Sequence, residues 1–218
     1  MADVLAVLRE SKLVPVLVIE DPARAVKVAE ALATDGLVCA EVTFRTKRAA
    51  DALRRVADEM PEMYAGAGTV LTAKQAAEAR SAGAKFIVAP GFNAAVAEYC
   101  AAHQLPYFPG IATPTELETA LNHDLHVLKF FPAETLGGLP YLKAISAPYG
   151  KAVEFMPTGG ITAANVGGYL ALSQVVACGG SWMAPAEWVD AASYDRIQAA
   201  TQQAVLAVRK ALTTTEAE

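Results

Sequence analysis

The sequence predicts an α/β protein, a single-domain (β/α)8 TIM barrel with a short N-terminal helix, spanning residues 1–218. Short β-rich runs alternate with alanine-rich helical stretches along the chain, and no linker or low-complexity run divides the series. The strand candidates number about eight, which is the number that closes such a barrel. Hydrophobic residues make up 54% of the chain, so one large core can form.

The first β/α unit follows a short amphipathic helix at the N-terminus. Residues 14–19 form a near-continuous apolar run, which is typical of a strand buried on both faces. Asp21 is expected to cap the next helix, with Pro22 at its first position, and Gly36 is expected to end it.

The second unit combines a strand at residues 37–43 with a helix that begins after Thr46 and ends at Pro61. Thr113 and Glu116 predict a helix cap after the fifth strand. Further strands are expected at residues 63–67, 85–89, 105–109, 126–131, 153–157 and 175–178. An open doubly wound sheet could use the same units, but no G-x-G-x-x-G motif follows the first strand, so the barrel is favoured.

The composition excludes several classes of protein. The net charge of −5 argues against a general electrostatic grip on nucleic acid, and no apolar run is long enough to span a membrane. Three cysteines without a C-x-x-C pair indicate neither a disulfide framework nor a zinc site, so we expect a cytoplasmic protein. The isolated histidines are interpreted as surface residues rather than metal ligands, namely His103, His123 and His126.

Lys129 is the first candidate for chemistry because it lies in the bulky apolar strand at residues 126–131. A desolvated amine loses part of its preference for the protonated state, so it can attack a carbonyl and form a Schiff base. The alternative is that Lys129 points outward and reaches solvent at the rim of the barrel.

Glu41 is the second candidate, near the end of the strand at residues 37–43. Strand alternation points it inward, and even-numbered strands contribute to the same interior layers. Glu41 and Lys129 are therefore expected to meet across the barrel, where a carboxylate can move the protons of imine chemistry. The alternative is a structural ion pair.

Two glycine loops predict an anion site. Residues 158–161 follow the seventh strand and residues 179–181 the eighth, which is where this fold usually binds phosphate. Arg45 could add a positive charge and Thr69 a hydroxyl. Trp182 is expected to pack, or to shape the mouth of the site or a subunit contact. A single glycine pair more often marks a tight turn.

Six segments together resemble the family of 2-keto-3-deoxy-6-phosphogluconate (KDPG) and 4-hydroxy-2-oxoglutarate (KHG) aldolases. They are Glu-Val-Thr-Phe-Arg-Thr at residues 41–46, Gly-Ala-Gly-Thr-Val at 66–70, Pro-Gly-Ile at 109–111, Lys-Phe-Phe-Pro-Ala-Glu at 129–134, Pro-Thr-Gly-Gly-Ile at 157–161 and Gly-Gly-Ser-Trp at 179–182. The resemblance implies a homotrimeric class I aldolase with a TIM-barrel fold and no metal.

The resemblance also implies roles for individual residues. Lys129 would form the Schiff base with pyruvate, and Glu41 would be the general acid and base. Arg45 would contact the pyruvate carboxylate or the phosphate, and Thr69 and Pro90 would line the pyruvate pocket. The remaining substrate-binding residues would be Phe131 and Thr158, and the phosphate would lie on Gly159, Gly160, Gly180 and Ser181.

The expected activity is cleavage of KDPG to pyruvate and glyceraldehyde 3-phosphate, together with cleavage of KHG to pyruvate and glyoxylate. The covalent imine with Lys129 would replace any cofactor, and the partners would be the small-molecule substrates and further copies of the chain. One alternative is an aldolase for the galactonate epimer of KDPG. The others are a metal-dependent pyruvate aldolase and a non-catalytic barrel that binds a sugar phosphate.

Overall fold

The computed structural model describes residues 4–215, so residues 1–3 of the predicted N-terminal helix lie outside the described part. The strands are β1 (Leu13–Leu17), β2 (Cys39–Thr43), β3 (Tyr64–Gly68), β4 (Ile87–Val88), β5 (Tyr107–Phe108), β6 (Gly110–Ile111), β7 (Val127–Phe130), β8 (Glu154–Pro157) and β9 (Cys178–Gly180). The helices are α1 (Val4–Ser11), α2 (Ala25–Ala33), α3 (Ala49–Glu59), α4 (Ala73–Ser81), α5 (Ala94–Ala102), α6 (Pro114–Leu121), α7 (Gly138–Ser146), α8 (Val166–Leu170), α9 (Ala186–Asp190) and α10 (Tyr194–Thr215), with 3-10 turns η1 (Pro22–Arg24) and η2 (Ala147–Ala152).

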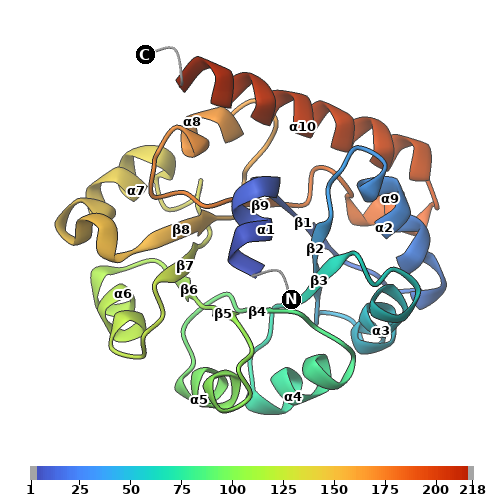
Figure 1. Cartoon of the computed structure of the whole chain (residues 1–218), viewed down its shortest axis with the longest axis horizontal. Helices are drawn as coiled ribbons and strands as arrows, with labels where there is room; N and C mark the ends of the chain where they lie inside the picture. The colour runs from blue at the N-terminus through green and yellow to red at the C-terminus, as the bar shows by residue number, and fades with distance from the viewer. Residues whose placement is uncertain (1–3, 216–218) are drawn as a thin grey trace.

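The strands are parallel and curl around a common centre, with α2 to α10 outside them and α1 across one end (Figure 1). One sheet has the order β5-β4-β3-β2-β1-β9 and the other the order β6-β7-β8. β5 and β6 lie on either side of Pro109, in place of the single predicted strand that ends at that residue. Proline has no N–H to donate to a ladder, which accounts for the interruption.

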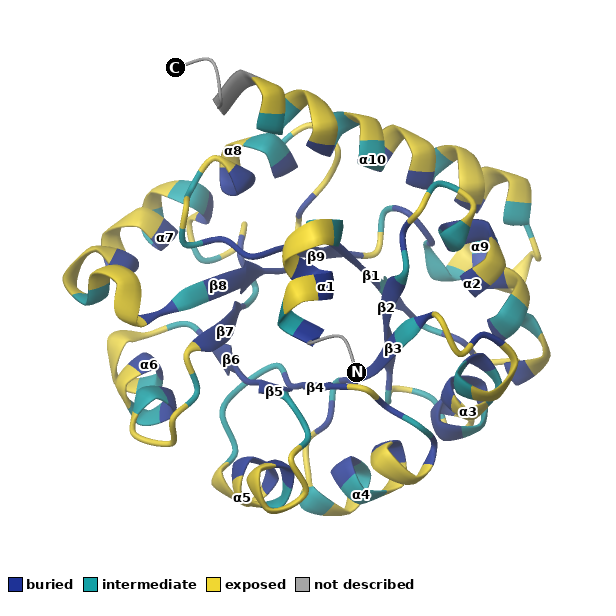
Figure 2. Ribbon diagram, in the orientation of Figure 1, coloured by how far each residue is buried: buried dark blue, intermediate teal, exposed yellow. Residues whose placement is uncertain are grey.

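The strands form the core because both of their faces are covered (Figure 2). β2 and β7 are buried along their whole length. The helices turn their apolar sides toward the strands and leave charged residues outside. In α3 the apolar side faces inward, since Ala49, Leu53 and Val56 are buried.

The start of the first β/α helix differs from the prediction. Asp21 does cap, because its carboxylate accepts a hydrogen bond from the Ala23 N–H at 3.0 Å, but the first turn is the 3-10 turn η1 and α2 begins only at Ala25. Such turns are frequent at helix N-termini. The predicted cap of α6 is confirmed as a reciprocal capping box between Thr113 and Glu116.

Helix α1 covers the end of the sheet at which the strands begin (Figure 1). Leu8 of α1 is fully buried, and Leu5 lies beside the starts of β5 and β7 at Tyr107 and Val127. At the opposite end of the sheet, α1 does not cover the loops that follow the carboxyl ends of the strands. In this fold that end carries the active site.

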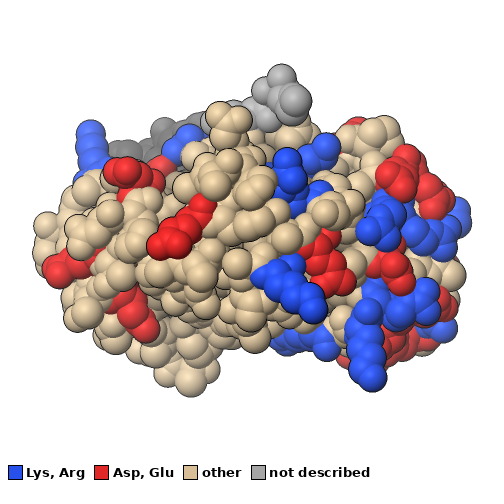
Figure 3. All heavy atoms as spheres, turned by 90° about the horizontal axis from the view of Figure 1, so that it is seen from below, with Lys and Arg blue, Asp and Glu red and all other residues tan. Residues whose placement is uncertain are grey.

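The surface shows charges of both signs rather than a patch of one sign. Lys, Arg, Asp and Glu side chains mix toward the side of α3 on the face drawn in Figure 3. Several of them are ion pairs, such as Arg48 with Asp51 at 2.7 Å and Arg55 with Glu59 at 2.9 Å. Among residues 4–215, no helix is both long and apolar enough to cross a membrane.

Candidate active site

The centre of the site is an ion pair between two strands on different sides of the interior. Lys129 on β7 and Glu41 on β2 are 4% and 1% exposed, respectively. The Lys129 Nζ lies 3.3 Å from Glu41 Oε1 and 3.4 Å from Oε2. The structure therefore brings the two side chains together, and the alternative of an outward-pointing Lys129 is wrong.

A glycine makes room for the Glu41 carboxylate. Gly68 pairs with Thr43 in the neighbouring strand, and a Cβ atom at Gly68 would lie 1.9 Å from Glu41 Oε1. Gly110 plays a similar part beside Lys129, its partner in the ladder, because a Cβ there would lie 2.0 Å from the Pro90 carbonyl oxygen. Because glycine has no side chain, Gly68 leaves room for the Glu41 carboxylate and Gly110 leaves room for the Pro90 backbone.

A cavity of about 450 Å³ lies at the carboxyl ends of the strands, and neither Lys129 nor Glu41 is among the residues that line it. Phe131 belongs both to the cavity wall and to the surroundings of the amine, since the Lys129 Nζ lies 5.2 Å from the centre of its ring. Seven of the predicted site residues line the cavity: Arg45, Phe131, Thr158, Gly159, Gly160, Gly180 and Ser181.

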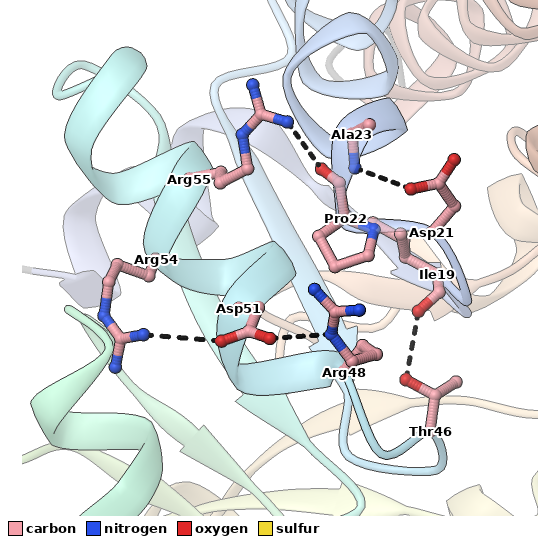
Figure 4. Close-up of polar contacts among 9 residues, drawn as sticks. All are labelled: Ile19, Asp21, Pro22, Ala23, Thr46, Arg48, Asp51, Arg54 and Arg55. Atoms are coloured by element: carbon pink, nitrogen blue, oxygen red, sulfur yellow. Dashed lines mark hydrogen bonds and ion pairs between the residues drawn. The ribbon is translucent and has the colours of Figure 1, made fainter.

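Arg45 reaches the cavity from the loop after β2. Its Nε donates a hydrogen bond to Thr69 Oγ1 at 3.3 Å, so these two predicted residues lie together. The loop is held in place by its neighbours (Figure 4): Thr46 Oγ1 donates to the Ile19 carbonyl at 3.0 Å, and Arg48 is paired with Asp51. These contacts hold the backbone that carries Arg45 at the cavity.

Four predicted residues lie outside the cavity wall: the catalytic candidates Lys129 and Glu41, and also Thr69 and Pro90. Thr69 contacts it only through Arg45, and Pro90 lies against Gly110, next to Lys129 in the ladder. Apolar wall residues went unpredicted, among them Val16, Val18 and Pro185, because an apolar side chain carries no chemical signal in a sequence. Trp182 packs against the hydrophobic core, as expected, and it also lines the cavity.

The buried cysteines do not compete with Lys129 as nucleophiles. Burial raises the pKa of the Cys39 thiol to about 12, and it raises the pKa of the Cys178 thiol as well. Both therefore stay protonated at neutral pH, and a thiol is a much weaker nucleophile than a thiolate. In the part of the chain that the structure describes, no three His, Cys, Asp or Glu side chains are grouped so that they could hold a metal ion.

Comparison with known families identifies the chain. Residues 4–200 match the family model described as KDPG and KHG aldolase. The chain belongs to the KDPG and KHG aldolase family. Among its relatives, the 2-dehydro-3-deoxy-phosphogluconate aldolase of Treponema pallidum is 46% identical over 93% of this chain and 96% of the relative.

Solved structures of KDPG aldolases have the same fold. The enzyme of Legionella pneumophila, with pyruvate captured as a covalent carbinolamine, superposes with a TM-score of 0.87 at 37% identity, over 91% of this chain and 96% of that one. The enzyme of Zymomonas mobilis, with 3-phosphoglycerate, gives a TM-score of 0.86 at 40% identity, over 94% and 96% of the two chains.

Proposed function

We propose that this aldolase cleaves KDPG to pyruvate and glyceraldehyde 3-phosphate through a Schiff base on Lys129. The observation that carries the proposal is the buried Lys129 amine, which lies 3.3 Å from the Glu41 carboxylate and 5.2 Å from the ring of Phe131. Phe131 in turn lines the cavity that the two glycine loops enclose. The carbinolamine of pyruvate in the Legionella enzyme supports the covalent route.

Lys129 supplies the electron sink of the reaction. Its neutral amine adds to the C2 ketone of the substrate to give a carbinolamine, and loss of water then gives a cationic imine. When the C3–C4 bond breaks, its electron pair moves toward the imine nitrogen and forms an enamine. Protonation of the enamine at C3 and hydrolysis of the imine release pyruvate and restore the amine.

Glu41 supplies and removes the protons of these steps. Its carboxylate takes the proton of the C4 hydroxyl as the C3–C4 bond breaks, which releases the aldehyde. The same group donates a proton when the carbinolamine loses water. Because Glu41 is only 1% exposed, bulk water does not compete with it for these protons.

The rest of the cavity binds the two ends of the substrate. Phe131 lies on the side of the amine. Together with Thr158, Thr69 and Pro90 it forms the proposed pyruvate pocket. The phosphate lies on the glycine loops, where Gly159, Gly160, Gly180 and Ser181 line the cavity, and Arg45 adds a positive charge. KHG carries a carboxylate in place of the phosphorylated arm and gives glyoxylate by the same steps.

We propose a finer architecture as well. The two sheets form one closed (β/α)8 barrel in a single domain of residues 1–218, in which β5 and β6 count as one strand. Parallel bridges between Phe155 and Val175 and between Thr158 and Gly179 support closure, because they join β8 to the segment of β9. The chain acts as a homotrimer in the cytoplasm without a resident metal, as the family resemblance implies.

The test is reduction with borohydride in the presence of pyruvate, followed by intact mass measurement and peptide mapping. A reduced pyruvate adduct on Lys129, with turnover of KDPG that persists in a chelator, is the expected result. Turnover that a chelator abolishes, without an adduct, would instead establish a metal-dependent aldolase. Binding of a sugar phosphate without adduct or turnover would establish a binding protein.

Replacing Gly68 with alanine tests the room made for Glu41. The new Cβ would overlap the carboxylate, which is buried and cannot move into solvent, so Glu41 is displaced from Lys129. We expect kcat for KDPG to fall about 100-fold, the order seen when a catalytic group is misplaced by about 1 Å. Gly91→Ala is the control, since nothing lies within 4 Å of a Cβ at that position. A Gly68→Ala enzyme as fast as the control would refute this role.

A further inference from the structure

The loop that follows β8 is held from behind through three successive carbonyl groups. The Thr158 carbonyl accepts a hydrogen bond from the Ala133 N–H at 2.8 Å, and the Gly159 carbonyl accepts one from the Glu134 N–H at 3.0 Å. The third, that of Gly160, accepts from a side chain, the Nδ2 of Asn165, at 3.1 Å.

This arrangement sets the direction of the amide groups. In a trans peptide the C=O and the following N–H point in opposite directions, so a carbonyl bound at the rear turns the next N–H to the front. The Gly159 and Gly160 carbonyls thereby orient the N–H groups of Gly160 and Ile161, two residues that line the cavity. Among the described residues, no group accepts a hydrogen bond from either N–H.

The loop needs such support because its backbone is unusual. Gly160 has φ +81°, and a Cβ at this position would lie 2.6 Å from the Cβ and Cγ of Glu134. Glu134 is itself held by the buried Tyr169 hydroxyl, which donates to its carboxylate. The side chain of Glu134 thus backs the loop on one side.

Asn165 holds the other side of the loop. Its Oδ1 accepts from the Thr162 N–H at 2.8 Å while its Nδ2 donates to Gly160, so one side chain fixes both ends of the turn. The Nδ2 bond is the one that determines the plane of the peptide between Gly160 and Ile161.

We infer that Asn165 is a positioning residue that aims the Ile161 N–H at the substrate phosphate, and that it thereby sets the preference for phosphorylated over unphosphorylated substrates. The inference rests on the proposed function. Asn165 lies behind the loop, and its two hydrogen bonds are made to the loop itself, whereas the imine chemistry takes place on β2 and β7. Loss of the Asn165 side chain is therefore expected to weaken binding of the phosphate and to leave the reaction at the carbon atoms unchanged.

The test compares KDPG and KHG as substrates of Asn165→Ala. Without the Nδ2 donor the peptide is free to rotate, so KM for KDPG is expected to rise about tenfold, corresponding to one well-placed hydrogen bond. KM for KHG, which has no phosphate, and kcat for both substrates are expected to stay within about twofold.

Asn93→Ala is the matched control. Asn93 has the same kind of contacts in the loop after β4, since its Nδ2 donates to the Leu71 carbonyl at 3.1 Å and its Oδ1 accepts from the Val96 N–H at 3.3 Å. Loss of a purely structural hydrogen bond is expected to change KM for KDPG and KM for KHG by the same factor. This is the pattern expected for Asn93→Ala.

Asn165→Asp provides a second variant if the alanine enzyme does not fold. It keeps the acceptor for the Thr162 N–H, replaces the donor to Gly160 with an acceptor and adds a negative charge behind the loop, so it too is expected to raise KM for KDPG selectively. Equal effects of an Asn165 variant on both substrates, or no effect, would overturn the inference. A wild-type enzyme that forms no pyruvate adduct and cleaves neither substrate would refute the proposed function itself.

Discussion

Lys129→Met is expected to lose at least about 10⁵-fold in kcat for KDPG, because the variant lacks the amine that is proposed to form the Schiff base and losses of this order follow removal of a covalent nucleophile. The variant is also expected to show no pyruvate adduct after borohydride reduction. Methionine keeps nearly the same length and apolar volume, so the cavity is retained. Turnover within about 100-fold of wild type would contradict a Schiff base at Lys129.

The same substitution is expected to destabilise the fold. It leaves the Glu41 carboxylate, 1% exposed, without its partner, and removing one member of a buried ion pair costs about 3–5 kcal/mol. Denaturant unfolding measures this loss. The double variant with Glu41→Gln removes the unpaired charge and is expected to recover much of it. Lys85→Met, at an exposed position, is the control and is expected to change the unfolding free energy by less than about 0.5 kcal/mol.

Glu41→Gln is expected to lower kcat about 10²- to 10⁴-fold while still giving the pyruvate adduct on Lys129. The amide keeps an oxygen that can accept a hydrogen bond from Nζ, but it cannot take the C4 hydroxyl proton or return one. Carbon–carbon cleavage therefore suffers more than imine formation. Single-turnover experiments with KDPG, in parallel with borohydride trapping of pyruvate, separate the two steps.

The control for this variant is Glu154→Gln. Glu154 is also a strand glutamate paired with a cation, Arg9, but it begins β8 at the opposite end of the sheet from the cavity. Its kcat is expected to equal that of the wild type. If Glu41→Gln behaved in the same way, Glu41 would be a structural partner of Lys129 and the acid–base role would have to be assigned elsewhere.

The pairing of Lys129 with Glu41 could be predicted because it follows from regular geometry. Side chains alternate along a strand, and the second and sixth predicted strands, which are β2 and β7 in the structure, are expected to contribute to the same interior layers. The positions of the two residues in their strands therefore predict that the side chains lie close together. The glycine loops could also be predicted, because a pair of adjacent glycines directly after each of two successive strands is visible in the sequence itself.

Features that depend on three-dimensional contact were not predictable. The hydrogen bond from Asn165 to Gly160 joins a polar side chain to a backbone carbonyl, and asparagine at such a position reads only as a turn residue. The break between β5 and β6 at Pro109 depends on whether a neighbouring strand would accept a hydrogen bond from a backbone N–H at that position. The need for glycine at position 68 follows only from the contact with the Glu41 carboxylate in the folded structure.

The cover that α1 forms over the starts of the strands has a kinetic consequence. With Leu8 fully buried beneath that helix, substrate and products are expected to pass through the cavity at the carboxyl ends of the strands. Under the proposed mechanism pyruvate is still bonded to the deep Lys129 amine when the aldehyde is set free, so the aldehyde departs first. Pyruvate is therefore expected to inhibit cleavage competitively with KDPG, and glyceraldehyde 3-phosphate noncompetitively.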